Sequence, residues 1–357
     1  MAGLLGRACV TDFVPILCWA MALAGAAATG SAALIRLLRP LLLRYALARP
    51  NARSAHVVPT PQGGGIAVVG AALLAASSGG AALSIAGEGA LRLGLVAAAA
   101  VLIGLVGAID DIRPLPPLPR LGLQLIGVGI MVSALPDTAR VLPMLPVGLE
   151  RAMLVIGGGW FVNLVNFMDG MDWMTVAETV PMTATLMLFW AAGFLSAPAG
   201  LLAAGLCGGL LGFAPFNRPV ASLFLGDVGS LPIGLIVAYC LFDLAAHGGL
   251  AAAILLPLYY IADSGITLLW RLRRGDRVWE AHRWHFYQVA TARGFTVRQV
   301  LLRVVLVNCA LAIFAAASLL QTSPVLALLD VGLGTALVAK LLRDLARGRP
   351  ANLNSRR

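Results

Sequence analysis

The sequence predicts an all-α, polytopic integral membrane protein. Of its 357 residues, 60% are hydrophobic and only 12% are charged, whereas soluble domains are roughly a quarter charged. Apolar stretches of about 20 residues, the length that crosses a bilayer core, recur along the chain with short polar breaks. We expect one membrane domain over 1–357, with the polar motifs at about 56–288, C-terminal spans at 300–342 and a basic tail at 343–357.

About ten or eleven membrane-spanning helices are expected, and we place eleven. The fourth is short, and the sixth and seventh are separated by so few residues around Ser196 that their turn must be tight. The predicted spans are 12–34, 65–83, 90–109, 121–135, 152–167, 174–195, 199–216, 230–246, 249–270, 300–320 and 324–342.

The basic residues predict which ends of the spans face the cytoplasm. With the N-terminus outside, segments 35–64, 110–120, 168–173, 217–229, 271–299 and 343–357 lie on one side. Of the 26 Lys and Arg, only Arg7, Arg92, Arg140 and Arg151 fall on the other side. The positive-inside rule therefore predicts a multi-pass protein of the inner (plasma) membrane whose polar loops face the cytoplasm, with the first span retained rather than cleaved as a signal peptide.

Two function classes are excluded by composition. The five cysteines are scattered and form no close-spaced pair, which argues against a disulfide framework or a zinc cluster. The net charge of +10 comes from residues that flank spans, where orientation and anionic lipid headgroups explain it. We therefore expect membrane lipid, and no nucleic acid, as a partner.

Two adjacent carboxylates end the third predicted span. Asp110 and Asp111 lie at the membrane edge, and Arg120 follows ten residues later at the start of the next span. Adjacent acids repel and desolvate each other, so such a pair calls for a cation or a proton-transfer role. The structural alternative is a solvated helix cap.

Amides and carboxylates spaced by three residues end the fifth predicted span. Asn163, Asn166 and Asp169 follow one another at this spacing, and Asp172 comes after a glycine. Residues three apart are helical neighbours, so Asn163 and Asn166 can face one ligand. A helix-terminating turn of Asn, Asp and Gly is the alternative.

A third acidic position precedes the eighth predicted span. Asp227 lies between glycines in the stretch Gly-Asp-Val-Gly-Ser, which leaves it free to approach a metal. Asp227, Asn166 and one of the two adjacent acids offer hard oxygen ligands of the kind that suit magnesium, whose shell is completed by substrate phosphate and water.

The first cytoplasmic segment contains His56, then Pro-Thr-Pro, then the glycines 63–65 at the start of the second span. Glycines before a helix N-terminus expose backbone N–H groups that can cradle a phosphate. A flexible turn before a helix is the alternative.

The last long loop is strongly basic and contains His282-Arg283-Trp284-His285. Guanidinium and imidazole groups can bind a diphosphate, and a zinc pair of the two histidines lacks a third soft ligand. Asp263 lies near the cytoplasmic end of the ninth span, where an ionisable residue is a functional candidate by default. Anchoring to anionic headgroups is the alternative for four earlier arginines of the loop, Arg271, Arg273, Arg274 and Arg277.

Taken together, these motifs resemble the polyprenyl-phosphate N-acetylhexosamine-1-phosphate transferases, the superfamily of the peptidoglycan translocase and of enzymes that initiate O-antigen synthesis. The resemblance runs from about His56 to Gln288 and rests on five ordered motifs at alternating loops. It implies transfer of a sugar 1-phosphate from a UDP-N-acetylhexosamine to undecaprenyl phosphate, with release of UMP. The His-Arg-x-His form of the last loop is closer to the O-antigen and surface-polysaccharide branch.

The resemblance also implies roles for the motif residues. Asp227 and Asn166 match the magnesium ligands, with manganese as the alternative ion, and Asp110 and Asp111 match the catalytic acids. Because adjacent helical residues point about 100° apart, the two acids are not expected to share one role. The positions that match substrate-binding residues, or that we add to them, are His56, Arg120, Asn163, Asp169, Asp172, Asp263, His282, Arg283 and His285.

One position departs from the family pattern, and one function competes. Trp173 follows Asp172 where the family usually has glycine, which bears on the geometry near the nucleotide. The resemblance further implies a homodimer. The rival from another class is a transporter or flippase for an anionic lipid or nucleotide sugar, whose site should lie near the bilayer midplane. The acids and amides here lie at span ends, which favours the transferase.

Overall fold

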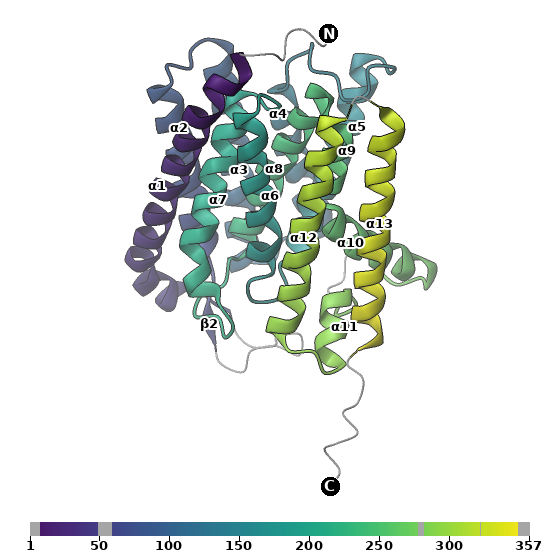
Figure 1. Ribbon diagram of the computed structural model, residues 1–357. Coiled ribbons are helices and arrows are strands. Elements are labelled where there is room, and N and C mark those ends of the chain that lie inside the picture. The colour runs from purple at the N-terminus through teal and green to yellow at the C-terminus, as the bar shows by residue number, and fades with distance from the viewer. Residues whose placement is uncertain (1–7, 49–58, 278–281, 322, 349–357) are drawn as a thin grey trace.

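The computed structural model describes residues 8–48, 59–277, 282–321 and 323–348. The long helices stand side by side in one bundle (Figure 1), so the expected all-α membrane fold is confirmed. The helices are α1 (Ala8–Tyr45), α2 (Gly64–Ala82), α3 (Glu88–Ile112), α4 (Pro117–Ser133), α5 (Val147–Met168), α6 (Met174–Ala191), α7 (Ala197–Asn217), α8 (Asp227–Leu244), α9 (Leu250–Leu255), α10 (Leu258–Arg273), α11 (Phe286–Ala292), α12 (Val297–Leu320) and α13 (Pro324–Arg347).

Within the described part of the chain, eight helices are long and apolar enough to cross a membrane. Helices α4, α6 and α10 fall outside that set, although each overlaps a predicted span. Helix α13 continues to Arg347, so the first residues of the predicted basic tail are helical.

The ninth predicted span, 249–270, is wrong as a continuous helix. Helix α9 continues α8 through a π-helical turn at Ala245–Gly249, in which Gly248 has a φ of 90°. The chain then breaks again before α10, whose first turn follows Pro257. Proline lacks the N–H that would continue the helical ladder, and glycine tolerates the positive φ. An apolar stretch of the right length is therefore two short helices.

Helix α7 is the buried centre of the N-terminal half of the bundle, and glycines allow its close packing. A Cβ at Gly208 would lie 2.0 Å from the carbonyl oxygen of Ala24 on α1, and one at Gly205 would lie 2.4 Å from that of Ala72 on α2. Small residues at such spacing let helix backbones approach in a membrane, where apolar side chains gain little by leaving lipid.

The alternation of the helices brings the polar connections to one end of the bundle, at the bottom of Figure 1. The α3–α4, α5–α6 and α7–α8 connections and the loop before α11 all lie there. This arrangement confirms that the motifs share one face. The orientation of that face toward the cytoplasm stays a prediction.

The glycines 63–65 serve packing at this face. The N–H groups of Gly64 and Gly65 donate to the carbonyls of Phe224 and Leu225, each at 2.9 Å. A Cβ on Gly65 would lie 2.1 Å from the Cα of Gly229, at the start of α8. Because these two amides are already bonded, they form no phosphate cradle. Next to them, the strands β1 (Leu47–Ala48) and β2 (Thr60–Pro61) pair antiparallel.

Candidate active site

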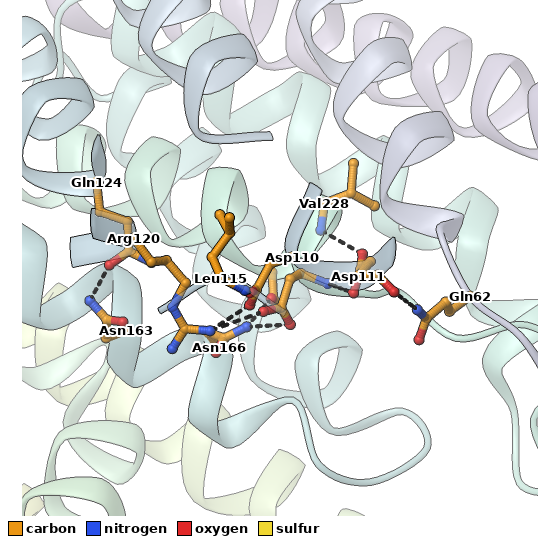
Figure 2. A network of polar contacts seen from close by, with 11 residues as sticks. Gln62, Asp110, Asp111, Leu115, Arg120, Gln124, Asn163, Asn166 and Val228 are labelled. Atoms are coloured by element: carbon orange, nitrogen blue, oxygen red, sulfur yellow. Dashed lines mark hydrogen bonds and ion pairs between the residues drawn. The ribbon is translucent and has the colours of Figure 1, made fainter. Parts of the chain in front are cut away.

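Four helix ends bring a cluster of charged side chains together at the polar face. Asp110 ends α3, Arg120 begins α4, Asn166 ends α5 and Asp227 begins α8. Figure 2 shows the side chains of Asp110, Arg120 and Asn166 pointing toward one another. We call these residues, together with Asp111, the carboxylate cluster.

Arg120 lies between two carboxylates that are far apart in the sequence. Its Nη1 is 2.5 Å from Oδ2 of Asp110 and 3.7 Å from Oδ2 of Asp227. The other oxygen of Asp110 accepts the N–H of Leu115 at 2.6 Å, which holds the turn between α3 and α4. The guanidinium of Arg120 therefore partly neutralises the charges of both Asp110 and Asp227, because one oxygen of each carboxylate faces it.

Asp111 has a different environment from its neighbour. Its two oxygens accept the backbone N–H groups of Asp227 and Val228, at 3.0 and 3.1 Å. These are the free donors of the first turn of α8, so Asp111 caps that helix from another helix. Asp110 faces Arg120 and Asp111 bonds the first amides of α8, so the two acids have different environments. Their separate roles stay a prediction.

The amides of α5 form a polar row that extends from the carboxylate cluster deeper into the bundle. Asn166 donates through Nδ2 to Oδ1 of Asp227 at 2.8 Å and to Oγ of Ser230 at 2.9 Å. Asn163 lies one turn deeper and donates to Oε1 of the buried Gln124 at 2.8 Å. Asn163 and Asn166 therefore share a helix face but bind different neighbours.

The turn after α5 carries Asp169 and Asp172. Asp169 accepts a hydrogen bond from the hydroxyl of Thr175, and Asp172 accepts the N–H of Ala221 at 3.0 Å. Burial raises the pKa of Asp169 to about 8, and the negative charges of Asp227, Asp111 and Asp172 add to the rise. These acids are close enough for their charges to interact, although Asp111 and Asp227 lie far from the α5–α6 turn in the sequence.

Trp173 shows why its position favours glycine. It has a φ of 63°, in the left-handed region, which costs a residue with a Cβ about 1–2 kcal/mol. Two hydrogen bonds hold the conformation, one from its N–H to Oδ1 of Asn217 at 2.8 Å and one from its indole Nε1 to the carbonyl of Ala214 at 2.6 Å. The turn thus keeps its shape without glycine.

The last loop is tied to α10 by a buried acid. Asp263, with no exposed surface, accepts the N–H of Phe286 at 3.1 Å and contacts Nδ1 of His285 at 3.0 Å. The Tyr259 hydroxyl donates to its other oxygen at 3.3 Å. Asp263 therefore positions His285 and the start of α11. Its role toward a substrate stays a prediction.

His282 lies beside His285, with ring centroids 4.9 Å apart. Burial, together with the nearby His285 and Arg271, lowers the pKa of His282 to about 4. At neutral pH this imidazole is therefore uncharged and offers hydrogen bonds rather than a positive charge. Arg271, which the sequence suggested as a lipid anchor, is instead buried, with 4% of its surface exposed.

Tyr287 joins the last loop to the turn after α5. Its ring stacks on His285, with centroids 5.7 Å apart, and a Cβ on Gly170 would lie 2.2 Å from its hydroxyl. Only glycine allows this approach between Asp169 and Asp172. The carboxylate cluster, the α5–α6 turn and the histidine loop thus form one continuous polar region.

Most of the predicted site residues meet in this region, but not all. His56 lies outside the described residues, and Arg283 is exposed on the histidine loop. Sequence reasoning missed Gln124, Arg271 and Tyr287 as parts of the region. Gln124 could have been found, because an amide buried inside a membrane helix needs a polar partner.

The donor set fits magnesium only together with a phosphate ligand. Asp110 and Asp227 present oxygens to one positive group, and rotation of the Asn166 amide would add a third oxygen, since its orientation follows from its partners. Among the described residues, no group of three His, Cys, Asp or Glu side chains is arranged to hold a metal. Magnesium commonly uses one or two carboxylates plus substrate phosphate and water.

Part of the chain is similar to a known protein family. Residues 93–245 match the model of the family described as glycosyl transferase family 4. The match includes the carboxylate cluster and the turn with Asp169 and Asp172, and it ends before the histidine loop.

The chain is also similar to individual curated proteins. A decaprenyl-phosphate N-acetylglucosaminephosphotransferase of Mycobacterium tuberculosis is 30% identical over 219 residues, 54% of this chain and 52% of the relative. A phospho-N-acetylmuramoyl-pentapeptide-transferase of Clostridium kluyveri is 34% identical over 108 residues, 30% of each chain. One from Enterococcus faecalis is 29% identical over 128 residues, 35% of this chain and 38% of that protein. The chain spans about half the length or less of these curated relatives.

Proposed function

We propose that this protein is a member of glycosyl transferase family 4 and transfers an N-acetylhexosamine 1-phosphate from a UDP-sugar to a polyprenyl phosphate. The observation that carries the proposal is the carboxylate cluster, in which Asp110, Arg120, Asn166 and Asp227 meet at the membrane face within the segment that matches the family. A lipid-linked acceptor with its phosphate at the membrane surface can reach such a site.

The reaction joins two phosphates. An oxygen of the polyprenyl phosphate attacks the phosphorus that carries the sugar, a new P–O–P bond forms, and the bond to the uridine-bearing phosphate breaks. UMP leaves with the bridging oxygen and its electron pair, and the product is a polyprenyl diphosphate sugar. Because both reactants are anionic, the site must neutralise charge and hold them in line.

The side chains divide this work. Arg120 supplies a fixed positive charge between Asp110 and Asp227, and Asp110 is placed to orient the attacking phosphate or accept its proton. Asp227, Asp110 and Asn166 would hold Mg²⁺, which supplies Lewis-acid stabilisation of the phosphoryl oxygens. His285, held by Asp263, and the neutral His282 can donate hydrogen bonds to the diphosphate.

The acceptor and donor follow from the motifs and relatives together. We propose undecaprenyl phosphate as the acceptor, in the inner membrane with the site facing the cytoplasm, and a role in the first step of O-antigen or other envelope polysaccharide synthesis. Among the donors, UDP-N-acetylglucosamine is the first to test, because the Mycobacterium relative is named for N-acetylglucosamine phosphate transfer.

The test is UMP release by purified protein given undecaprenyl phosphate, magnesium and each of several UDP-N-acetylhexosamines. Asp227→Ala, Asp110→Asn and Arg120→Ala should each lower kcat by at least about 100-fold, the loss typical when one electrostatic group of an active site is removed. Asp137→Asn is the matched control, because this acid is 91% exposed and lies outside the cluster.

Two results would contradict the proposal. One is that folded wild-type protein releases no UMP with any donor while liposomes that contain it move lipid or nucleotide sugar, which would establish the transporter. The other is that the three cluster variants retain the activity of Asp137→Asn.

A further inference from the structure

A cavity lies outside the carboxylate cluster, between α10, α11 and the last turns of α13. Its volume is about 490 Å³. Figure 1 shows α11 beside the lower end of α13, at the polar end of the bundle. The apolar part of its wall consists of Ile266, Leu269, Phe286, Val289 and Ala346.

One polar group is buried inside this apolar wall. Thr267 lines the cavity and is 3% exposed, and its Oγ1 has no hydrogen-bond partner in the described part of the chain. A buried hydroxyl without a partner is costly, by about 1–3 kcal/mol. A helical threonine usually bonds the carbonyl one turn back. The Thr267 hydroxyl oxygen has less than 1 Å² of accessible surface, so an occupant of the cavity would touch the rest of this side chain and not the hydroxyl.

The rim of the cavity is basic. Arg273 on α10 and Arg293 after α11 both line it and are exposed, and among the lining residues that the structure describes none is acidic. Arg343 and Arg347 lie within one turn of Ala346 on α13, with Asp344 as the acid nearby in the sequence. The rim therefore favours an anionic group.

Tryptophans mark the depth of the cavity. Trp270 and Trp284 both line it and meet edge to face, with ring centroids 5.1 Å apart. The guanidinium of Arg274 lies 4.8 Å from the first ring and 5.4 Å from the second. Tryptophan and arginine gather where the apolar core of a bilayer meets the headgroups, so the cavity opens at the level of lipid phosphates.

We propose that this cavity binds one anionic phospholipid. An acyl chain fills the apolar part, and the phosphate pairs with Arg273 and with the remaining N–H groups of Arg293, whose Nη1 also donates to the carbonyl of Ala346. The combination of apolar wall and basic rim matches this chemistry, and the membrane that the bundle spans supplies the ligand.

The bound lipid is distinct from the substrates of the proposed reaction. His285 turns inward to Asp263, whereas its neighbours Trp284 and Phe286 line the cavity on the outer side of the loop. A phosphate at Arg273 and Arg293 is thus separated from the carboxylate cluster by the backbone of the histidine loop. The occupant is a structural lipid, not the polyprenyl phosphate acceptor.

The test measures lipid binding without any assay of activity, so it does not depend on the proposed function. Purified, delipidated full-length protein is titrated with phosphatidylglycerol or with phosphatidylcholine of the same acyl chains, and bound lipid is counted by native mass spectrometry. The wild type should retain one phosphatidylglycerol. The double variant Arg273→Ala/Arg293→Ala should bind it about 30-fold more weakly, from the typical contribution of two basic residues at an anionic surface.

Two further variants make the result specific. Ala346→Trp fills the cavity and should reduce binding at least tenfold, while Arg39→Ala/Arg298→Ala changes the charge equally at exposed positions elsewhere and should stay within twofold of the wild type. The proposal is overturned by tight binding to the Arg273/Arg293 variant, by equal retention of phosphatidylcholine, or by one-for-one displacement of the lipid by polyprenyl phosphate.

Discussion

Replacement of Asp111 by alanine tests whether this acid stabilises the start of α8 or takes part in the reaction. In the structure both oxygens of Asp111 are occupied by the N–H groups of Asp227 and Val228, at 3.0 and 3.1 Å. Asp110, one residue earlier, instead faces Arg120. We therefore expect substitution of Asp110 to lower activity alone, and substitution of Asp111 to lower both stability and activity.

The size of the effect follows from the two bonds. Loss of an N-cap acceptor costs about 0.5–2 kcal/mol, and hydrogen bonds to a charged group contribute about 1.5–3 kcal/mol each. Water reaches the partly exposed cap and offsets part of the loss, so we expect about 2 kcal/mol for Asp111→Ala. For a chain of this length that corresponds to a fall in Tm of about 3 °C. Asp110→Asn keeps an oxygen for Leu115. It loses the ion pair with Arg120 but also removes the repulsion of Asp111 and Asp227, so the two effects offset and its Tm should change by less than about 1 °C.

Thermal unfolding in detergent and UMP release, measured on the same preparations, check this expectation. Asp110→Asn should lose activity while it keeps its Tm, and Asp111→Ala should lose both. If Asp111→Ala keeps the wild-type Tm and loses activity as completely as Asp110→Asn, the cap reasoning is refuted and Asp111 acts on the substrate.

Three other changes test the structure around the site. Gly65→Ala should lower the unfolding free energy by about 3 kcal/mol, because its Cβ would meet the backbone of α8, whereas Gly94→Ala, with nothing within 4 Å, should not. Trp173→Gly should be about 1 kcal/mol more stable than Trp173→Ala in the same thermal assay, because only alanine carries a Cβ at positive φ. Since burial raises the pKa of Asp169 to about 8, above that of an unfolded aspartate, this carboxyl lowers stability as pH rises from about 4 to 8. Asp169→Asn should therefore raise Tm more at pH 8.5 than at pH 5, and an equal change at both would contradict the shift.

The membrane fold could be predicted because its cause is local. Any stretch of about 20 apolar residues can hide its backbone polar groups by forming a helix in lipid, and the positions of most helices follow from this. The break between α9 and α10 could not be located in the same way. The segment 249–270 is apolar enough to be one helix, but its backbone leaves the helical conformation at Pro257, just before α10.

The residues of the candidate site could be predicted from the sequence, but the contacts between them could not. The sequence predicts that acids and amides end the spans on one face, because alternating helices return every second loop to the same side. Three contacts are visible only in the folded chain: Asp111 caps α8, Asp263 holds His285, and Tyr287 contacts Gly170. Each of these contacts joins segments distant in the chain, so each depends on how the helices pack, which no local pattern encodes.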